Sequence, residues 1–545
     1  MIPAFFMLPE CCSSSPPAQL ENPCPEGVAK TEILAKGGSA VDAAIAALFI
    51  EGVVHPHATG IGGSCMFTIY DNVCKEVKTI TARGAAPGAA NESTIAKIAN
   101  PVTERGRTVC VPGLVRGCWW AHEDYGKLPW ADLIQPAARL CKEGFPLCPY
   151  LESVMFLQED RTTDDEELND YCTDPCTGCP YKIGNTIRNC QLGKSLCIIA
   201  KQGESAMYSG ELSEKLITDL KNVGGILSAD DFKKYLPIWG VPVSTTLPSD
   251  RIAYSVDAPG SGAVLLLMLN MFDGTVRCSN LNTTQNWHKI VEVFKFGMAA
   301  RTRLGDGVFD PCVNCIVDTI VTKNYASAMK KRITFFTHSD PVYYGATKPY
   351  GIDHGSSNIV VFGTEGDAAV VTSTIGQNFG SAFMSSSTGI VLNDEMHDFS
   401  IPSECRRSDV PNMSSNFIAP GKRPVSSMAP MIVMDKNQNV VFGIGAAGGV
   451  KSTVASALVT LRHLFCGEPI AKAISAKRLL HQLYPSTLIA ELGVGEKLLR
   501  ELMRLGHDVE IKMTDGFVAV TAMSKTSGYL SGSFDPRRGG AVELI

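Results

Sequence analysis

The sequence is organised around Asp353-His354-Gly355-Ser356-Ser357, which runs directly into the apolar, β-branched stretch Asn358-Ile359-Val360-Val361-Phe362. This order predicts a buried strand whose start carries a hydroxyl. If the Gly355–Ser356 bond is cut, Ser356 becomes an N-terminus whose α-amine, with a pKa of about 8, can accept the hydroxyl proton. Glycine suits position 355 because it tolerates strained torsions. The same residues also fit a plain turn before a strand, so the rest of the chain must decide.

The composition is that of a globular protein with a sizeable core. The chain has 545 residues, of which 45% are hydrophobic and 19% charged, and its net charge is −6. This length allows several domains or one large body of mixed helix and strand. No long basic block is present, which argues against nucleic acid as a partner.

The N-terminus fits neither a membrane span nor a typical signal peptide. The apolar stretch Met1–Pro9 ends at Glu10, far short of the roughly 20 residues that a spanning helix needs. It also lacks a basic segment before its apolar part. Two interpretations remain open: a cytosolic protein, or a sequence that begins downstream of a targeting segment.

The nineteen cysteines favour an exported protein. Clustered cysteines in turn-rich sequence indicate either disulfides or zinc ligands, and zinc sites usually include histidine at regular spacing. No histidine lies near the main cluster, so we expect disulfides, within an exposed insertion at residues 171–197. The odd number requires at least one free thiol or one bond to another chain. The clustered residues are Cys172, Cys176, Cys179, Cys190 and Cys197, with Cys312 and Cys315 elsewhere.

Three glycosylation sequons, at Asn91, Asn282 and Asn412, agree with export. Periodicity and turn residues predict an alternation of helices and antiparallel hairpins. We expect helices over 27–51 (broken at Gly37-Gly38-Ser39), 109–121, 130–143 and 453–465, strands over 65–70, 75–82, 358–362, 368–375 and 431–435, and a strand, turn and buried helix over 255–271.

The glycine-rich loop His55–Ser64 opens a strand rather than a helix, so it does not fit a nucleotide-binding loop. His55 and His57 could suggest a metal, but the sequence offers no carboxylate or third histidine as an obvious companion. We therefore predict no metal at this loop.

Several polar residues in apolar or glycine-rich surroundings are candidates for binding or catalysis. Arg83, at a strand end among alanines and glycines, has room for a carboxylate, although a solvated surface arginine is the alternative. Thr374 is expected beside the strand that starts at Ser356. Glu395 and Asp398 share one face of a helical turn, where they could hold an ammonium group or cap a helix. Gly448-Gly449 before a helix leaves backbone N–H groups bare, as an oxyanion hole or as a plain turn.

Together these motifs resemble the γ-glutamyltranspeptidases, members of the N-terminal-nucleophile hydrolase group. The resemblance runs from Gly37–Ala47 to Asp535–Gly540 and is densest at 372–400, 420–430 and 445–449. It implies roles for the following residues: Ser356 as nucleophile with Thr374 in support, Arg83 at the donor's α-carboxylate assisted by Ser426 and Ser427, Glu395 and Asp398 at its α-ammonium, and Gly448 and Gly449 as oxyanion hole.

Three positions depart from the family pattern. The usual nucleophile is Thr, whereas this chain has Ser356, which lacks the methyl group that restricts rotation about χ1. Asn358 stands where the animal enzymes usually have His. Gly376 stands where the family has an Asn that contacts the amino-acid head of the donor.

The resemblance implies an α+β fold, a four-layer αββα sandwich, cleaved into a large subunit (1–355) and a small one (356–545). It implies transfer of the γ-glutamyl group of glutathione or its conjugates to water or to an amino-acid or peptide acceptor, without metal or cofactor. Family members are membrane-anchored or secreted, which predicts the extracellular face of the plasma membrane or secretion. Two alternatives remain: a related acylase with another donor, and a non-catalytic member that is never cleaved.

Overall fold

The computed structural model describes residues 25–96, 98–347, 355–401, 414–513, 517–526 and 528–543. Our expectations for the Met1–Pro9 stretch, for Asp353-His354 and for the sequon at Asn412 lie outside these residues. The described sequons, at Asn91 and Asn282, are both exposed.

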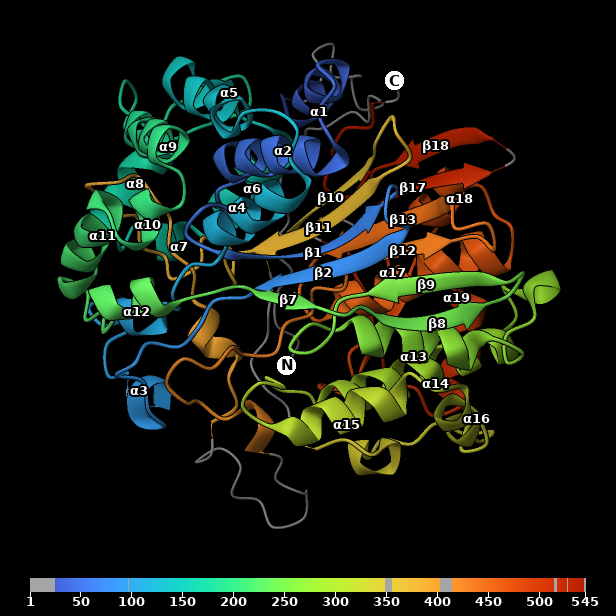
Figure 1. Cartoon of the computed structure of the whole chain (residues 1–545). Coiled ribbons are helices and arrows are strands. Elements are labelled where there is room, and N and C mark those ends of the chain that lie inside the picture. Colours follow the sequence, from blue (N-terminus) through green and yellow to red (C-terminus); the bar gives the residue numbers. More distant parts are fainter. Residues whose placement is uncertain are drawn as a thin grey trace.

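The first sheet carries the predicted serine strand at its edge. Its five strands are all antiparallel, and its order is β10-β11-β1-β2-β7 (Figure 1). Both predicted hairpins, β1 with β2 and β10 with β11, are confirmed by the strand pairing. The strands are β10 (Ser357–Phe362), β11 (Ala368–Thr374), β1 (Ser64–Asp71), β2 (Glu76–Ala82) and β7 (Ile238–Gly240).

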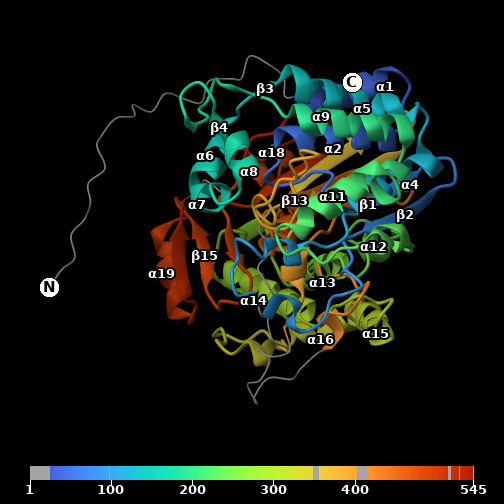
Figure 2. The same ribbon diagram turned by 90° about the vertical axis from the view of Figure 1, so that its left-hand side faces the viewer.

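A second antiparallel sheet of six strands faces the first, and a small sheet with α19 (Glu496–Arg504) forms one edge of the molecule (Figure 2). The order of the second sheet is β18-β17-β13-β12-β9-β8. Its strands are β18 (Tyr529–Ser533), β17 (Ala519–Thr526), β13 (Val440–Ala447), β12 (Met431–Met434), β9 (Arg251–Ser255) and β8 (Val243–Leu247). The small sheet contains β14 (Leu479–His481), β15 (Leu488–Glu491) and β16 (Val509–Lys512).

Alternate residues of β10 face opposite sides of the first sheet. Ile359 and Val361 belong to the apolar core that includes α2 (Ala40–Val54). Val360 belongs instead to a core between the sheets, with Ile432 of β12 and Met523 of β17. Because side chains in a strand alternate with a period of two, Ser356 shares the side of Val360 and faces the second sheet.

Helices cover the outer faces of both sheets (Figure 1). Helix α2 lies on β10 and β11, while α5 and α9 pack behind it; α13 and α17 lie on the second sheet. These helices and their neighbours are α1 (Pro25–Ala35), α4 (Leu114–Tyr125), α5 (Trp130–Glu143), α9 (Cys190–Gln202), α11 (Glu211–Lys221), α12 (Ala229–Lys234), α13 (Gly262–Phe272), α14 (Thr284–Arg301), α15 (Pro311–Ile320), α16 (Lys323–Lys330), α17 (Lys451–Thr460) and α18 (Ile470–Ser475).

Two predicted helices differ from expectation in their bounds. The helix expected from Val109 begins at Leu114, because Val111 runs extended and bridges Ala85 before Gly113 caps the helix. The helix expected over 453–465 is α17, which continues into a π-helical turn, Leu461–Phe465.

The expectation for the cysteine-rich segment was wrong in two respects. Residues 190–197 are not an exposed insertion, because they begin α9, which buries Leu192 and Leu196 against α5. The cysteines of the cluster are thiols: Cys172 is buried, and the others are exposed and unbonded. The disulfide among the described residues joins Cys278 and Cys466, which the sequence did not single out.

Among the described residues, no helix is both long enough and apolar enough to cross a bilayer.

Candidate active site

Ser356 lies at the start of β10 between the two sheets. Its side chain is largely buried, with 8% of the residue exposed. The backbone N–H of Gly448, at the end of β13, donates a hydrogen bond to Ser356 Oγ at 3.1 Å. The two stretches singled out from sequence, 92 residues apart, therefore meet across the layer between the sheets.

The carbonyl of Gly355 is also held by a predicted residue. Thr374 Oγ1 donates to Gly355 O at 2.7 Å and accepts from the N–H of Gly376 at 2.9 Å. The N–H of Gly355 donates in turn to Gly376 O at 2.7 Å. These contacts hold both sides of the peptide unit of Gly355, next to the bond that the predicted cleavage would break.

Gly448 and Gly449 form the turn between β13 and α17. Their φ angles are +139° and +65°, a region that favours glycine. A Cβ on Gly448 would lie 2.9 Å from Val518, so a side chain there would also collide. The turn thus presents the N–H of Gly448 at the Ser356 hydroxyl, so it lies where an oxyanion hole for a reaction at Ser356 would have to lie.

Arg83, Glu395 and Asp398 form one buried group of charges. Arg83 follows β2 and has no exposed surface. Its Nη1 lies 2.9 Å from Glu395 Oε1, and its Nη2 donates to Asp398 Oδ2. Glu395 and Asp398 share a 3-10 helical turn, as their spacing predicted. Neither the surface arginine nor the helix-capping alternative fits this arrangement, since Arg83 is buried and the carboxylates bind it.

Ser64 connects this charged group to the serine strand. Its hydroxyl donates to Glu395 and accepts from Arg83 Nη1 at 3.4 Å. In the β1–β11 pairing, Ser64 lies opposite Thr374. Sequence reasoning did not single out Ser64, although it directly follows Gly62-Gly63 at the start of a strand. The charged group and the Thr374–Gly355 contact therefore lie next to each other at the same end of the paired strands β1 and β11.

Burial raises the pKa of both the Glu395 and the Asp398 carboxyl, while the Arg83 guanidinium acts in the opposite direction. The group holds two acids and one permanent cation, so it can accept a ligand that brings its own positive charge. A ligand carboxylate could pair with Arg83 at the same time.

Ser426 and Ser427 lie where the chain approaches β12. The hydroxyl of Ser426 accepts from the N–H of Met428 at 3.2 Å. Ser427 Oγ accepts from Arg301 Nη2, at the end of α14, at 3.1 Å. Arg301 also lowers the pKa of Asp398 by its charge, which places it close to the charged group, although burial of Asp398 is the larger effect. This arginine stands at the end of a buried helix and belongs to no motif, so its role could not be predicted from the sequence.

Asn358 and Gly376, the two other positions that differ from the family pattern, each make specific contacts in the structure. Asn358 Oδ1 accepts from the hydroxyl of Thr372 at 2.8 Å, and its buried Nδ2 has no hydrogen-bond partner among the described residues. Gly376 has φ +93°, and a Cβ there would lie 1.9 Å from Asp394 Oδ1. The carboxylate of Asp394 thus occupies the position that the Cβ atom of any larger residue at 376 would need.

A pocket of about 90 Å³ opens beside Ser356. Glu51, His55 and His57 line it. A carboxylate does accompany His55, because Glu51 lies one helical turn earlier and its Oε2 is 2.8 Å from His55 Nδ1. This pair was not predicted from the sequence, although residues four apart on a helix lie on the same face and the spacing of Glu51 and His55 indicates such a contact.

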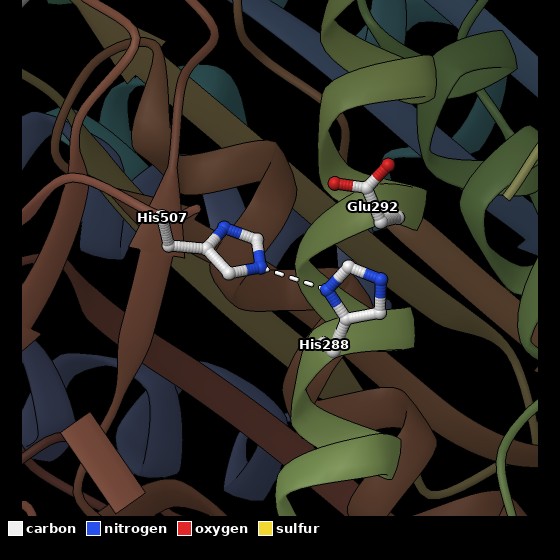
Figure 3. A group of neighbouring side chains, drawn as sticks. All are labelled: His288, Glu292 and His507. Carbon is white, nitrogen blue, oxygen red and sulfur yellow. Dashed lines mark hydrogen bonds between the residues drawn. The ribbon is translucent and has the colours of Figure 1, made fainter. Parts of the chain in front are cut away.

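His288, Glu292 and His507 form a second buried group, with ligand atoms within 4.8 Å of one another (Figure 3). His288 Nδ1 and His507 Nε2 share a hydrogen bond at 2.9 Å. Glu292 accepts from the Tyr344 hydroxyl at 2.9 Å and lies 3.8 Å from Lys295 Nζ. Burial, with the nearby Lys295, lowers the pKa of His507 to about 3. His507 Nδ1 is buried without a hydrogen-bond partner among the described residues. Because the other polar atoms of the group bond one another or neighbouring groups such as Tyr344, we interpret the group as a junction between α14 and the turn after α19.

Comparison with known proteins gives one consistent result. The family model for gamma-glutamyltranspeptidase matches residues 28–545. Scoloptoxin SSD14 of Scolopendra dehaani is 37% identical over 526 residues, covering 96% of this chain and 90% of that protein. Glutathione hydrolase 2 of Arabidopsis thaliana is 34% identical over 458 residues, covering 84% and 78%. The crystal structure of cephalosporin acylase from Bacillus halodurans superposes with a TM-score of 0.81 over 97% of this chain and 98% of that one, and at 21% identity this likeness concerns the fold alone.

Proposed function

The chain belongs to the γ-glutamyltranspeptidase family, and from this premise we propose that it is a γ-glutamyltransferase and glutathione hydrolase. It takes the γ-glutamyl group from glutathione or a glutathione conjugate and passes it to water or to an amino-acid or peptide acceptor. The observation that carries the proposal is the buried group of Arg83, Glu395 and Asp398 beside the serine strand. One guanidinium and two carboxylates complement the carboxylate and ammonium of a γ-glutamyl head.

Maturation is the first step of the proposed mechanism. Ser356 Oγ attacks the carbonyl carbon of Gly355, and the hydroxyl of Thr374, at 2.7 Å from the carbonyl oxygen, supports the negative charge that develops there. Collapse of the tetrahedral intermediate breaks the C–N bond between Gly355 and Ser356, which frees the α-amine of Ser356 and leaves Gly355 as an ester on Oγ. Water then hydrolyses this ester, which restores the Ser356 hydroxyl and leaves a carboxylate on Gly355. The products are the large subunit, 1–355, and the small subunit, 356–545, which together form the four-layer αββα sandwich of the N-terminal-nucleophile type.

Transfer then proceeds through a γ-glutamyl ester on Ser356. The α-amine takes the proton of Oγ, which attacks the γ-carbonyl of the donor, and the N–H groups of Gly448 and Gly449 stabilise the oxyanion. The γ-amide C–N bond of the donor then breaks, and the amine half of the donor leaves with the proton that the α-amine returns. Arg83, assisted by Ser426 and Ser427, binds the α-carboxylate of the donor. Water or an amine acceptor then attacks the ester and regenerates Ser356. No step requires a metal or an organic cofactor.

Two features support an extracellular location, secreted or at the plasma membrane. The Cys278–Cys466 disulfide is typical of oxidising compartments. The sequons at Asn91 and Asn282 lie on exposed residues.

A matched pair of donors tests the proposed function against the acylase alternative. γ-Glutamyl and glutaryl amides of the same amine differ only in the α-ammonium group that Glu395 and Asp398 are proposed to hold. Loss of one partner of a buried charge pair costs about 2–5 kcal/mol, so we expect kcat/KM to favour the γ-glutamyl donor by about 30-fold or more. Equal rates would support the acylase, and a chain that stays uncleaved and turns over neither donor would support a non-catalytic member.

A further inference from the structure

Cys148, His55 and Glu51 form a chain of three titratable side chains beside the pocket at Ser356. His55 Nε2 lies 3.8 Å from Cys148 Sγ, and His55 Nδ1 lies 2.8 Å from Glu51 Oε2. Glu51 belongs to the last turn of α2, and His55 is its C-cap residue. Proteins activate thiol nucleophiles by the same order of groups: a thiol, an imidazole that contacts it, and a carboxylate that orients the imidazole.

The thiol also lies at the start of a helix. Cys148 is the N-cap residue of α6 (Pro149–Leu157), and its Sγ accepts from the N–H of Leu151 at 3.4 Å. The N-terminus of a helix carries a partial positive charge, which favours the thiolate over the thiol. The residue is half-buried, so a small reagent can reach it.

The surroundings favour a thiolate paired with an imidazolium. Burial raises the pKa of Cys148, but His55 and the helix N–H groups outweigh burial, so the pKa lies below its ordinary value. Burial lowers the pKa of His55, but Glu51 and Cys148 outweigh it, so that pKa lies well above 6.5. The pKa of Glu51 is lowered, because His55 and Lys30 outweigh its burial.

The adjacent pocket has more cationic than anionic side chains in its lining. Lys30, His55 and Arg538 line it together with one carboxylate, that of Glu51, which pairs with His55. His57, whose ring centroid is 5.9 Å from that of His55, is neutral at physiological pH, because burial and the charge of His55 lower its pKa well below 6.5. Such a lining attracts small molecules that carry carboxylates.

We propose that Cys148 is a thiol-modification site that exchanges with small anionic disulfides attracted by the pocket lined by Lys30, His55 and Arg538. The thiolate attacks one sulfur of the disulfide, whose S–S bond breaks as a new S–S bond forms at Cys148. The other half leaves as a thiolate, which takes a proton from solvent. Cys148 is oxidised and half of the disulfide is reduced, so no further reactant is needed. The exchange uses none of the side chains assigned to γ-glutamyl transfer, although the pocket also borders Ser356.

Alkylation of the full-length protein tests the reactivity of Cys148. Iodoacetamide is added at pH 6.5, where a thiol of ordinary pKa near 8.5 is on the order of 1% thiolate. Cys74 is the matched control, because it is exposed while Asp71 raises the pKa of its thiol. Peptide mass mapping should show Cys148 alkylated at least about tenfold faster than Cys74. A rate equal to or below that of Cys74, or a disulfide between Cys148 and another cysteine of the chain, would overturn the proposal.

Two variants separate activation from simple exposure. His55→Asn and Glu51→Gln should each slow alkylation of Cys148 at pH 6.5 by on the order of tenfold, and the rates should converge with the wild-type rate near pH 9.5, where any accessible thiol is ionised. Alkylation of Cys74 should not change in either variant. If both variants retain the wild-type rate at pH 6.5, the imidazole and carboxylate do not activate the thiol.

Glutathione disulfide is the probe for the exchange itself. After incubation near pH 7, Cys148 should carry one glutathionyl group that dithiothreitol removes, and the Cys148→Ser protein should lack this adduct. The neutral disulfide of 2-mercaptoethanol should react more slowly than glutathione disulfide. Rapid alkylation without a glutathionyl adduct, or faster reaction with the neutral disulfide, would overturn the assignment to anionic disulfides.

Discussion

Thr374 donates a 2.7 Å hydrogen bond from its hydroxyl to the carbonyl oxygen of Gly355. This contact positions the bond that the proposed maturation breaks, and it polarises the carbonyl that Ser356 Oγ must attack. The same hydroxyl accepts from Gly376, so its orientation is fixed before cleavage begins.

Replacing Thr374 by Val, which keeps the shape and removes the hydroxyl, should slow cleavage by about 10²–10³-fold, the usual effect of losing one oxyanion donor. Thr372→Val is the matched control, because Thr372 lies on the same face of β11 but bonds Asn358. The rate is measured from the appearance of the two subunits on reducing gels. Cleavage of Thr374→Val at the wild-type rate would exclude this role.

Arg83→Ala should raise KM for glutathione strongly and leave cleavage intact. Removing one partner of a buried charge pair costs about 2–5 kcal/mol, equivalent to a change of about 30-fold or more in KM. Arg107→Ala is the control, because Arg107 is a partly exposed arginine paired with Glu104. Near-normal KM in the cleaved Arg83→Ala enzyme would contradict the assignment of the carboxylate site.

KM for glutathione should rise as the pH is lowered. Glu395 and Asp398 bind the donor ammonium only while ionised, and burial raises the pKa of both, so they take up protons at a higher pH than exposed carboxyls do. Steady-state kinetics measured as the pH is lowered from neutrality should show this rise, because the two carboxyls take up protons before exposed carboxyls do. Asp398→Asn should have a high KM with a weaker dependence on pH, whereas a wild-type KM that does not change as the pH is lowered would argue against the site.

The Cys278–Cys466 disulfide crosses the proposed cleavage point, since the two cysteines lie on opposite sides of Ser356. The mature enzyme should therefore run as one band on a denaturing gel without reductant and as two bands with it. Cys466→Ser should give two bands under both conditions. Separate subunits from the wild-type protein in the absence of reductant would show that the bond does not form.

Local patterns predicted most of the fold. The apolar, β-branched stretches 358–362 and 368–375, with a turn between them, predicted the β10–β11 hairpin, and the glycine break at Gly37-Gly38-Ser39 predicted the boundary between α1 and α2. The segment 190–197 was mistaken for an insertion because its cysteines outweighed the helical spacing of Leu192, Leu196 and Ile199. Helix α4 starts late because Val111 pairs with Ala85, a contact that local sequence does not reveal.

The candidate site was predicted in part from residue types and in part from the family resemblance. Arg83, Glu395 and Asp398 do meet, as the family resemblance implied by assigning them to the two charged groups of one donor. Ser64, Arg301 and the Cys148–His55 contact were missed, because each depends on which strands and helices become neighbours in space. No motif of a few consecutive residues contains that information.

The central claim is that Ser356 cleaves the chain and then serves as the nucleophile. Intact mass and N-terminal sequencing of the reduced wild-type protein test it most directly. We predict two polypeptides, the smaller beginning at Ser356, with one uncleaved and inactive chain for Ser356→Ala and a cleaved, active enzyme for Ser356→Thr, whose methyl group restricts χ1. A small subunit that begins at another residue, or an active Ser356→Ala protein, would contradict the account.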